Sequence, residues 1–312
     1  MKAIRIHQFG DTSNLNYEDI PKPTLSAGEV LIKNEACGVN PIDWKTCSGG
    51  GAAPFIGDLP FVPGWEFAGV IDQVAEDVAD FSPGDNVFGM IRFPEPAGCY
   101  AEYIAAPAGE ISLRPNSLDS KTAGGLCTAG LTAWQALFDK GQLKAGQRVL
   151  ILGAAGGVGH IAVQLAKWAG AEVIGTASEK NHDFLRALGA DQLCDYQSCD
   201  ITTTFSELDL IIDAVGGDTG LGALDCLAQD GTLVTLPSVT KDLIIAAGDA
   251  KGLNVLPIRA EANAEQLKEI AALYDQGKLQ LNLAQSFPLS QVAEAFKLSA
   301  SGHVRGKLVL TP

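Results

Sequence analysis

The most informative part of the sequence is residues 147–159, which read Gln147-Arg148-Val149-Leu150-Ile151-Leu152-Gly153-Ala154-Ala155-Gly156-Gly157-Val158-Gly159. Its first part, Arg148 to Leu152, is a short apolar run of the kind that a parallel sheet buries on both faces. Small residues follow and allow backbone amides to approach a ligand, and from Val158 onward apolar residues recur at helical spacing. The N-terminus of such a helix presents unpaired N–H groups and a partial positive charge, which suit a pyrophosphate. The stretch therefore predicts the first βα turn of a dinucleotide-binding half.

The glycine pattern of this turn departs at one position from the usual Gly-x-Gly-x-x-Gly fingerprint. Ala154 stands at the first glycine, whereas Gly156 and Gly159 occupy the second and third. Glycines near a turn can also be ordinary turn residues, so the motif depends on its context. A second apolar run, Glu172 to Thr176, follows at the spacing of a βαβ unit, and this context favours dinucleotide binding over a bare turn.

Composition limits the classes of protein to consider. The chain has 312 residues, 46% of them hydrophobic, which is enough for a sizeable core and two domains. Its net charge of −15 argues against nucleic acid or an anionic membrane surface as a partner. No apolar run has transmembrane length, and the first residues have the pattern of a strand rather than of a signal peptide. Seven cysteines, an odd number without a Cys-x-x-Cys pair, predict neither a disulfide framework nor a structural zinc site, and a reducing cytoplasm is the expected compartment.

The character of the sequence changes near residue 120. Before that point, short strand-like runs alternate with Pro- and Gly-rich turns, which predicts a small barrel-like β domain. Beyond it, strand-like and helix-like runs alternate, which is the pattern of a doubly wound parallel sheet. From residue 259 a helix, a strand, a second helix and a final strand close the chain, and we expect this tail to return to the first domain.

Several separate motifs occur in the order typical of one enzyme family. They are Gly38-Val39-Asn40-Pro41-Ile42-Asp43-Trp44-Lys45, Pro63-Gly64-Trp65-Glu66-Phe67-Ala68-Gly69, Ala129-Gly130-Leu131-Thr132-Ala133-Trp134, the glycine-rich turn, and Gly302-His303-Val304-Arg305-Gly306-Lys307. On these motifs the chain resembles the medium-chain dehydrogenase/reductase superfamily along nearly its whole length, in particular the zinc-independent quinone oxidoreductase and enone reductase branch that includes zeta-crystallin. The resemblance implies an α/β fold with a GroES-like catalytic domain at 1–120, a Rossmann domain at 121–258, and a return to the catalytic domain at 259–312. It also implies a homodimer.

Zinc-dependent members of this family hold a catalytic metal with Cys, His and Cys ligands. In this chain Trp65 stands at the His position, Asn40 at the first Cys, and Thr128 or Cys127 at the third. An indole cannot ligate zinc and an amide is a poor ligand, so fewer than three protein ligands remain. We therefore expect an enzyme without metal, in which Glu66 orients the local backbone.

The end of the second strand indicates which dinucleotide is bound. An NAD site usually has Asp or Glu there to accept from the ribose 2′-OH, and Gly175-Thr176-Ala177 carries none. Ser178 and Lys180 could bind a 2′-phosphate, and similar proteins use a Tyr where Tyr196 stands. The alternatives are a helix cap for Ser178, a solvated Lys180 and a half-buried core ring for Tyr196. We expect NADPH, although Glu179 turned inward would repel the phosphate.

The resemblance implies further contacts with the cofactor. Thr132 would reach the nicotinamide–pyrophosphate end, Val215 the adenosine side, and Lys307 a phosphate, unless Lys307 is a solvated charge beside the last strand. The full set of expected cofactor residues is Thr132, Ala155, Gly156, Gly157, Val158, Ser178, Lys180, Tyr196, Val215, Leu236 and Lys307. His160, just past the turn, is expected to be exposed.

Reduction by hydride places negative charge on a substrate oxygen, and donors at that point lower the barrier. We expect Lys45 to stabilise the developing oxyanion and Asn40 to help place nicotinamide or substrate, because the family directs this segment at the nicotinamide. Alternatively, Asn40 only caps a short helix and Lys45 is solvated. Trp44, Phe55 and Trp65 would line an apolar acceptor pocket, or belong to the core.

The expected activity is therefore NADPH-dependent hydride transfer to quinones or α,β-unsaturated carbonyls. A second hypothesis is a catalytically weak NADPH-binding sensor or structural protein, as crystallin-like relatives illustrate. A zinc-type alcohol dehydrogenase is a third, which Trp65 disfavours.

Overall fold

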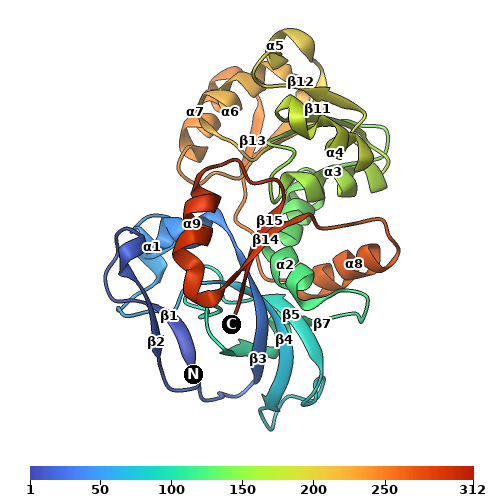
Figure 1. The fold of residues 1–312 in the computed structure, drawn as a ribbon. Helices are drawn as coiled ribbons and strands as arrows, with labels where there is room; N and C mark the ends of the chain where they lie inside the picture. The colour runs from blue at the N-terminus through green and yellow to red at the C-terminus, as the bar shows by residue number, and fades with distance from the viewer. The chain divides into compact units, whose positions relative to one another are not determined.

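The computed structural model describes residues 1–312, which divide into two compact units (Figure 1). The first comprises residues 1–131 and 261–312, and the second residues 132–260. None of the helices combines the length and apolar composition that crossing a membrane requires.

The second unit is built on a six-stranded sheet in the order β10-β9-β8-β11-β12-β13, in which every neighbouring pair is parallel. The strands are β8 (Arg148–Leu152), β9 (Glu172–Thr176), β10 (Gln192–Cys194), β11 (Leu208–Asp213), β12 (Leu227–Thr235) and β13 (Asn254–Pro257). Residues 149–152 of β8 are fully buried, which explains their continuous apolar character. The order reverses between β8 and β11, and open α/β sheets bind ligands at the strand carboxyl ends beside such a reversal. The predicted doubly wound α/β fold is confirmed.

The helices of this unit connect successive parallel strands. They are α3 (Gly159–Trp168), α4 (His182–Ala187), α5 (Ile201–Thr204), α6 (Gly217–Ala223) and α7 (Lys241–Lys251). Figure 1 shows α3 and α4 on one side of the sheet and α6 and α7 on the other. This is the two-sided cover that a sheet buried on both faces needs.

The first unit is mainly antiparallel. A seven-stranded sheet has the order β14-β15-β3-β4-β5-β7, with β6 also paired to β3, and β1 pairs with β2. The strands are β1 (Lys2–Ile6), β2 (Leu15–Asp19), β3 (Glu29–Val39), β4 (Glu66–Val74), β5 (Asn86–Met90), β6 (Tyr103–Pro107), β7 (Ile111–Leu113), β14 (Leu283–Pro288) and β15 (Lys307–Thr311). The helices are α1 (Pro41–Cys47), α8 (Ala264–Asp275) and α9 (Val292–Ala300). The last strand, β15, pairs antiparallel with β3, so the end of the chain lies within the first unit.

Helix α2 (Ser120–Trp134), which is followed by a π-helical segment (Gln135–Lys140), crosses the boundary between the units. The boundary expected at 120/121 differs from that of the compact units, the first of which extends to Leu131. Most of α2 packs on that unit: a Cβ added at Gly124 would lie 2.7 Å from the Ala36 carbonyl oxygen, and one at Gly125 would lie 2.9 Å from the Val309 side chain. A change from strand-like to helix-like sequence marks an element, not a domain boundary.

The structure contains one disulfide, between Cys194 and Cys199, whose Cα atoms are 5.7 Å apart. The cysteine count predicted no disulfide framework, and it gave no sign of this single short-range bridge. The other five cysteines are free and buried.

Candidate cofactor and active site

The glycine-rich turn has the close packing that a phosphate cradle requires. Gly153 has φ +68°, and Gly156 N donates to the Gly153 carbonyl at 3.0 Å. A Cβ at Gly159 would overlap the Gly153 carbonyl oxygen and lie 2.8 Å from Ala154 Cα, so only glycine fits there. Ala154 is buried and donates its N–H to the Thr176 carbonyl at 2.9 Å, so alanine is accommodated at the first glycine position.

The turn leaves backbone donors for a ligand at the start of α3. The N–H groups of Ala155, Gly157 and Val158 donate no hydrogen bond within the chain. Together with the helix N-terminus they form a concentrated set of donors for an anionic group. A pyrophosphate fits this chemistry.

His160 lies inside the second unit, which corrects the expectation that it is exposed. It is fully buried, and its Nδ1 lies 2.8 Å from the Gly156 carbonyl oxygen. Because α3 begins at Gly159, position 160 faces inward. His160 therefore supports the glycine turn from within.

Two expected residues lie at the carboxyl ends of β11 and β12. Val215 follows β11 and is exposed, and Leu236 follows β12. Asp213 forms hydrogen bonds to both Val215 and Leu236. Its Oδ1 accepts from Val215 N at 3.0 Å, and its main-chain carbonyl accepts from Leu236 N at 2.9 Å. The buried Asp213 was missed from the sequence, although a lone carboxylate at the end of an apolar strand was a visible signal. Thr132, on the last turn of α2, is half-buried.

The residues expected to select NADPH surround the ends of β9 and β10. Thr176 pairs with Cys194 in these strands, and Ala177 N donates to the Cys194 carbonyl at 3.1 Å. Tyr196 is 56% exposed, so it is not a core ring. Lys180 is also exposed, whereas Ser178 is half-buried and its Oγ accepts from Asn181 Nδ2 at 3.2 Å. Glu179 is exposed rather than turned inward, and no carboxylate stands at the tip of β9.

In the first unit, a buried polar network holds the start of α1. Leu308 pairs with Val39, which brings Lys307 beside Asn40. The Lys307 ammonium lies 3.0 Å from Glu66 Oε1, donates to the Val39 carbonyl at 3.2 Å and contacts Asn40 Oδ1. Asn40 Nδ2 donates to Glu66 Oε1 at 2.6 Å. Lys307 is 4% exposed and Glu66 is fully buried, so the pair is screened from water.

Hydrogen bonds to Glu66 and to the nearby Asp43 connect several elements of the first unit. Its second oxygen, Oε2, accepts from Thr128 N of α2 at 2.7 Å. A Cβ at Gly38 would overlap Glu66 Oε1, so only glycine fits at the first position of the motif that runs from Gly38 to Lys45. Asp43 Oδ2 accepts from Asn40 N at 2.6 Å and from the Tyr100 hydroxyl at 2.8 Å. Burial raises the pKa of Asp43 to about 7.

This network corrects the expectation for Lys307. Lys307 is neither a phosphate ligand nor a solvated charge, because its ammonium is buried among three oxygen atoms. Asn40 is 7% exposed, and its amide donates one N–H to Glu66 while its oxygen contacts the Lys307 ammonium. Neither partner could be read from local sequence, because Lys307 and Asn40 are 267 positions apart.

The side chain of Lys45 is partly accessible to solvent. It lies in the last turn of α1, is only partly buried, and its Nζ lies 5.4 Å from the centroid of the Trp44 ring. Its side chain makes no ion pair or hydrogen bond within the chain. The Lys45 ammonium therefore keeps its hydrogen-bond donors unoccupied by other residues of the chain.

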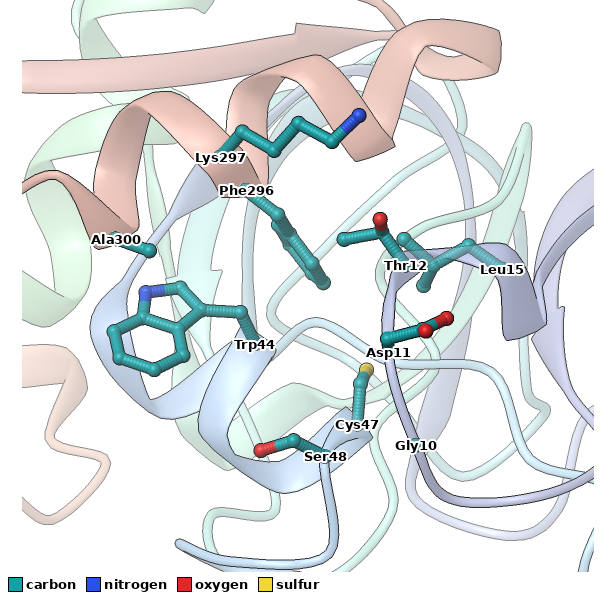
Figure 2. Close-up of a pocket in the computed structure, with 10 residues that line it drawn as sticks. All are labelled: Gly10, Asp11, Thr12, Leu15, Trp44, Cys47, Ser48, Phe296, Lys297 and Ala300. Atoms are coloured by element: carbon teal, nitrogen blue, oxygen red, sulfur yellow. The ribbon is translucent and has the colours of Figure 1, made fainter.

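The three aromatic residues expected to line one acceptor pocket lie in different environments. Trp65 is 2% exposed, packs against Phe93 and donates from Nε1 to the Glu95 carbonyl at 2.8 Å, so it belongs to the core. Phe55 is 47% exposed. Only Trp44 lines the cavity of about 200 Å³ shown in Figure 2, which lies between α1, α9 and the segment before β2. The other lining residues are Gly10, Asp11, Thr12, Leu15, Cys47, Ser48, Phe296, Lys297 and Ala300.

Comparison with known proteins agrees with the fold. Residues 26–116 match the family described as alcohol dehydrogenase GroES-like domain, and residues 188–310 match that described as zinc-binding dehydrogenase. The chain is 30% identical to a chloroplast envelope quinone oxidoreductase homolog of Arabidopsis thaliana, over 100% of this chain and 98% of the relative. It is 31% identical to the chloroplastic NADPH-dependent alkenal/one oxidoreductase of the same plant, over 100% and 80%. The solved quinone oxidoreductase of Coxiella burnetii is 40% identical, with a TM-score of 0.96 over 100% of this chain and 99% of that one.

The matches cover the β unit, the dinucleotide-binding unit and the return of the tail, in the order that the sequence motifs predicted. The chain therefore belongs to the medium-chain dehydrogenase/reductase superfamily, in its group of quinone oxidoreductases and alkenal/one reductases.

Proposed function

We propose that this NAD(P)H oxidoreductase uses NADPH to reduce quinones or α,β-unsaturated carbonyls, without a metal. The observation that carries the proposal is the second unit's cofactor cradle: a tight glycine turn with free backbone donors, beside a β9 end that has no carboxylate. A similar protein is named an NADPH-dependent alkenal/one oxidoreductase, which supports both the cofactor and the acceptor class.

In the proposed binding mode the residues of the cradle have distinct tasks. The N–H groups of Ala155, Gly157 and Val158 bind the pyrophosphate, and Ser178, Lys180 and Tyr196 surround the 2′-phosphate. When bound, the nicotinamide supplies a hydride. Lys45 donates to the substrate oxygen on which charge accumulates, because its ammonium is unpaired and accessible.

Zinc, which the name of one matching family implies, does not fit the residues present. Trp65 is buried with its indole N–H bonded to the Glu95 carbonyl, and an indole offers no lone pair to a metal. Asn40 Oδ1 already faces the ammonium of Lys307, which would repel a metal cation at that atom. The buried Glu66 has Lys307 as its counter-ion. No step of the reaction is therefore assigned to a metal.

We also propose a homodimer. Strand β13 is at the edge of the six-stranded sheet, so its outer backbone groups can pair with a second copy. Light scattering of the purified chain would give a dimer mass, and a monomer at every concentration would contradict this.

The test of function follows the absorbance of reduced nicotinamide with a panel of quinones and short enones, in buffer containing a chelator. We expect turnover with NADPH. Lys45→Met should lower kcat about 100-fold and leave the NADPH Kd unchanged, since one oxyanion donor is lost. Lys121→Met, an exposed lysine on α2, is the matched control. Equal kcat values for the two variants would refute the role of Lys45, and NADPH binding without turnover on any acceptor would favour a sensor or structural protein.

A further inference from the structure

The disulfide lies next to the residues proposed to hold the 2′-phosphate. Cys194 is the last residue of β10, and Cys199 follows the short turn that contains Tyr196. Both cysteines and all of the proposed 2′-phosphate residues belong to the second unit. The bridge therefore closes a small loop with Tyr196 inside it.

Hydrogen bonds connect the bridge to the cofactor cradle. The Cys194 carbonyl accepts from Ala177 N at 3.1 Å, immediately before Ser178. One residue earlier, Thr176 Oγ1 accepts from Gly153 N at 3.1 Å. Movement of Cys194 is thus transmitted to the residue that precedes Ser178 and to the glycine turn.

Cys199 packs against the core of the second unit, whereas the residues between the two cysteines are held mainly by hydrogen bonds to Asp195. The Asp195 carbonyl accepts from Ser198 N at 3.0 Å and from Cys199 N at 2.8 Å, and Asp195 Oδ1 accepts from Gln197 N at 3.1 Å. These bonds are local and solvent-accessible, and such bonds open readily. The position of the Tyr196 ring, which is largely exposed, therefore depends on the covalent bridge.

Of the two bridged cysteines, Cys199 is the more accessible to a reductant. Cys194 is buried, whereas Cys199 is half-buried between exposed Ser198 and Asp200. Attack by a thiolate is consequently directed at Cys199 Sγ. The nearest free thiol in the same core, Cys226, does not compete, because burial raises its pKa to about 11 and keeps it protonated.

We propose that the Cys194–Cys199 pair is a reversible redox-modification site that sets the affinity of the cradle for the 2′-phosphate of NADPH. The inference rests on the proposed function, which assigns Ser178, Lys180 and Tyr196 to that phosphate. The oxidised pair holds Tyr196 in place for binding. The reduced pair releases the loop between Cys194 and Cys199. NADPH must then order this loop when it binds, so its affinity is lower.

The reductant is a dithiol. One of its thiolates attacks Cys199 Sγ and breaks the S–S bond, and Cys194 leaves as a thiolate that takes up a proton. The second thiol of the reductant then attacks the mixed disulfide and releases Cys199 as a thiol. Two electrons and two protons pass to the protein, and the dithiol becomes a disulfide.

The experiment compares the Kd of NADPH and of NADH for oxidised and dithiothreitol-reduced protein, with thiol titration reporting the state of the pair. Reduction should raise the Kd of NADPH about 5-fold and leave that of NADH nearly unchanged, because only NADPH carries the phosphate that Tyr196 meets. Cys199→Ser should behave as the reduced protein under both conditions. Cys226→Ser, which leaves the bridge intact, should still respond to dithiothreitol.

The outcomes separate this inference from the proposed function. An NADPH preference that is the same in both redox states would overturn the inference and leave NADPH as the cofactor. Equal affinity for NADPH and NADH in both states would overturn the proposed cofactor and the inference with it. Failure of the bridge to reduce, shown by an unchanged thiol count, would also overturn the inference.

Discussion

Removing the Lys307 ammonium should destabilise the first unit strongly, and Lys307→Met is the substitution that tests this. The methionine keeps the apolar stem but leaves the fully buried Glu66 without its counter-ion. Asn40 Nδ2 and Thr128 N, at 2.6 and 2.7 Å, would be its remaining donors. Breaking a buried pair by removing one partner costs about 3–5 kcal/mol. In a unit of this size each kcal/mol lowers Tm by about 2–4 °C, so we expect a fall of about 10 °C.

Calorimetry on the purified chain measures this shift, and an exposed pair provides the control. Lys268 on α8 lies 3.9 Å from Glu265, with 71% of its side chain exposed. Such surface pairs contribute about 0–1 kcal/mol, so Lys268→Met should change Tm by no more than about 4 °C. The double variant Glu66→Gln/Lys307→Met removes both charges and should regain at least half of the loss, because no unpaired charge stays buried.

Two results would contradict a stabilising role for the Lys307–Glu66 pair. If Lys307→Met lowers Tm no more than Lys268→Met, the buried ion pair does not hold the first unit together. If the double variant is as unstable as the single one, the loss comes from packing around the stem rather than from the charge left on Glu66.

Three other predictions follow from named contacts. Burial raises the pKa of Asp43 to about 7, above its value in the unfolded chain. The protonated carboxyl therefore adds to the free energy of unfolding in full below about pH 4, and this contribution is lost as the pH rises to 7. Asp43→Asn should remove that decline from a plot of the urea midpoint against pH, and an unchanged slope would contradict the assignment. Gly159→Ala should abolish dinucleotide binding in a fluorescence titration, because its Cβ would overlap the Gly153 carbonyl, whereas Gly109→Ala, with open space around it, should bind normally. Tyr196→Phe should weaken NADPH about 5-fold through one lost hydrogen bond and spare NADH; equal weakening of both would place Tyr196 elsewhere than at the phosphate.

The second unit could be predicted well because its signal is local. The strand β8, the turn and the start of α3 are contiguous, and the close approach of Gly159 to Gly153 depends on residues only six positions apart in the printed sequence. The absence of a β9 carboxylate is also visible in a few consecutive residues. The phase of a helix start is harder to infer, and the inward-facing His160 was misplaced because one residue decides whether a side chain points in or out.

The first unit was predicted less well because its site is assembled from distant segments. Glu66 begins β4, Asn40 precedes α1 and Lys307 begins β15, and only the pairing of β15 with β3 brings them together. The local sequence around a lysine such as Lys307 does not show whether its side chain is solvated or buried. The disulfide was missed for a related reason, since the turn at Asp195 brings Cys199 back toward the end of β10.

Lys45 and Lys307 lie in different environments, and this difference supports the proposed catalytic role of Lys45 over a catalytic role of Lys307. Lys45 and Lys307 were both expected to meet cofactor or substrate, yet Lys307 is 4% exposed and fully paired. Its charge is committed to Glu66, and the network it completes fixes Asn40 at the start of the helix that carries Lys45. Loss of Lys45 should therefore change turnover without changing Tm, whereas loss of Lys307 should change Tm first. If instead Lys45→Met lowered Tm and Lys307→Met lowered only kcat, the two roles would have to be exchanged.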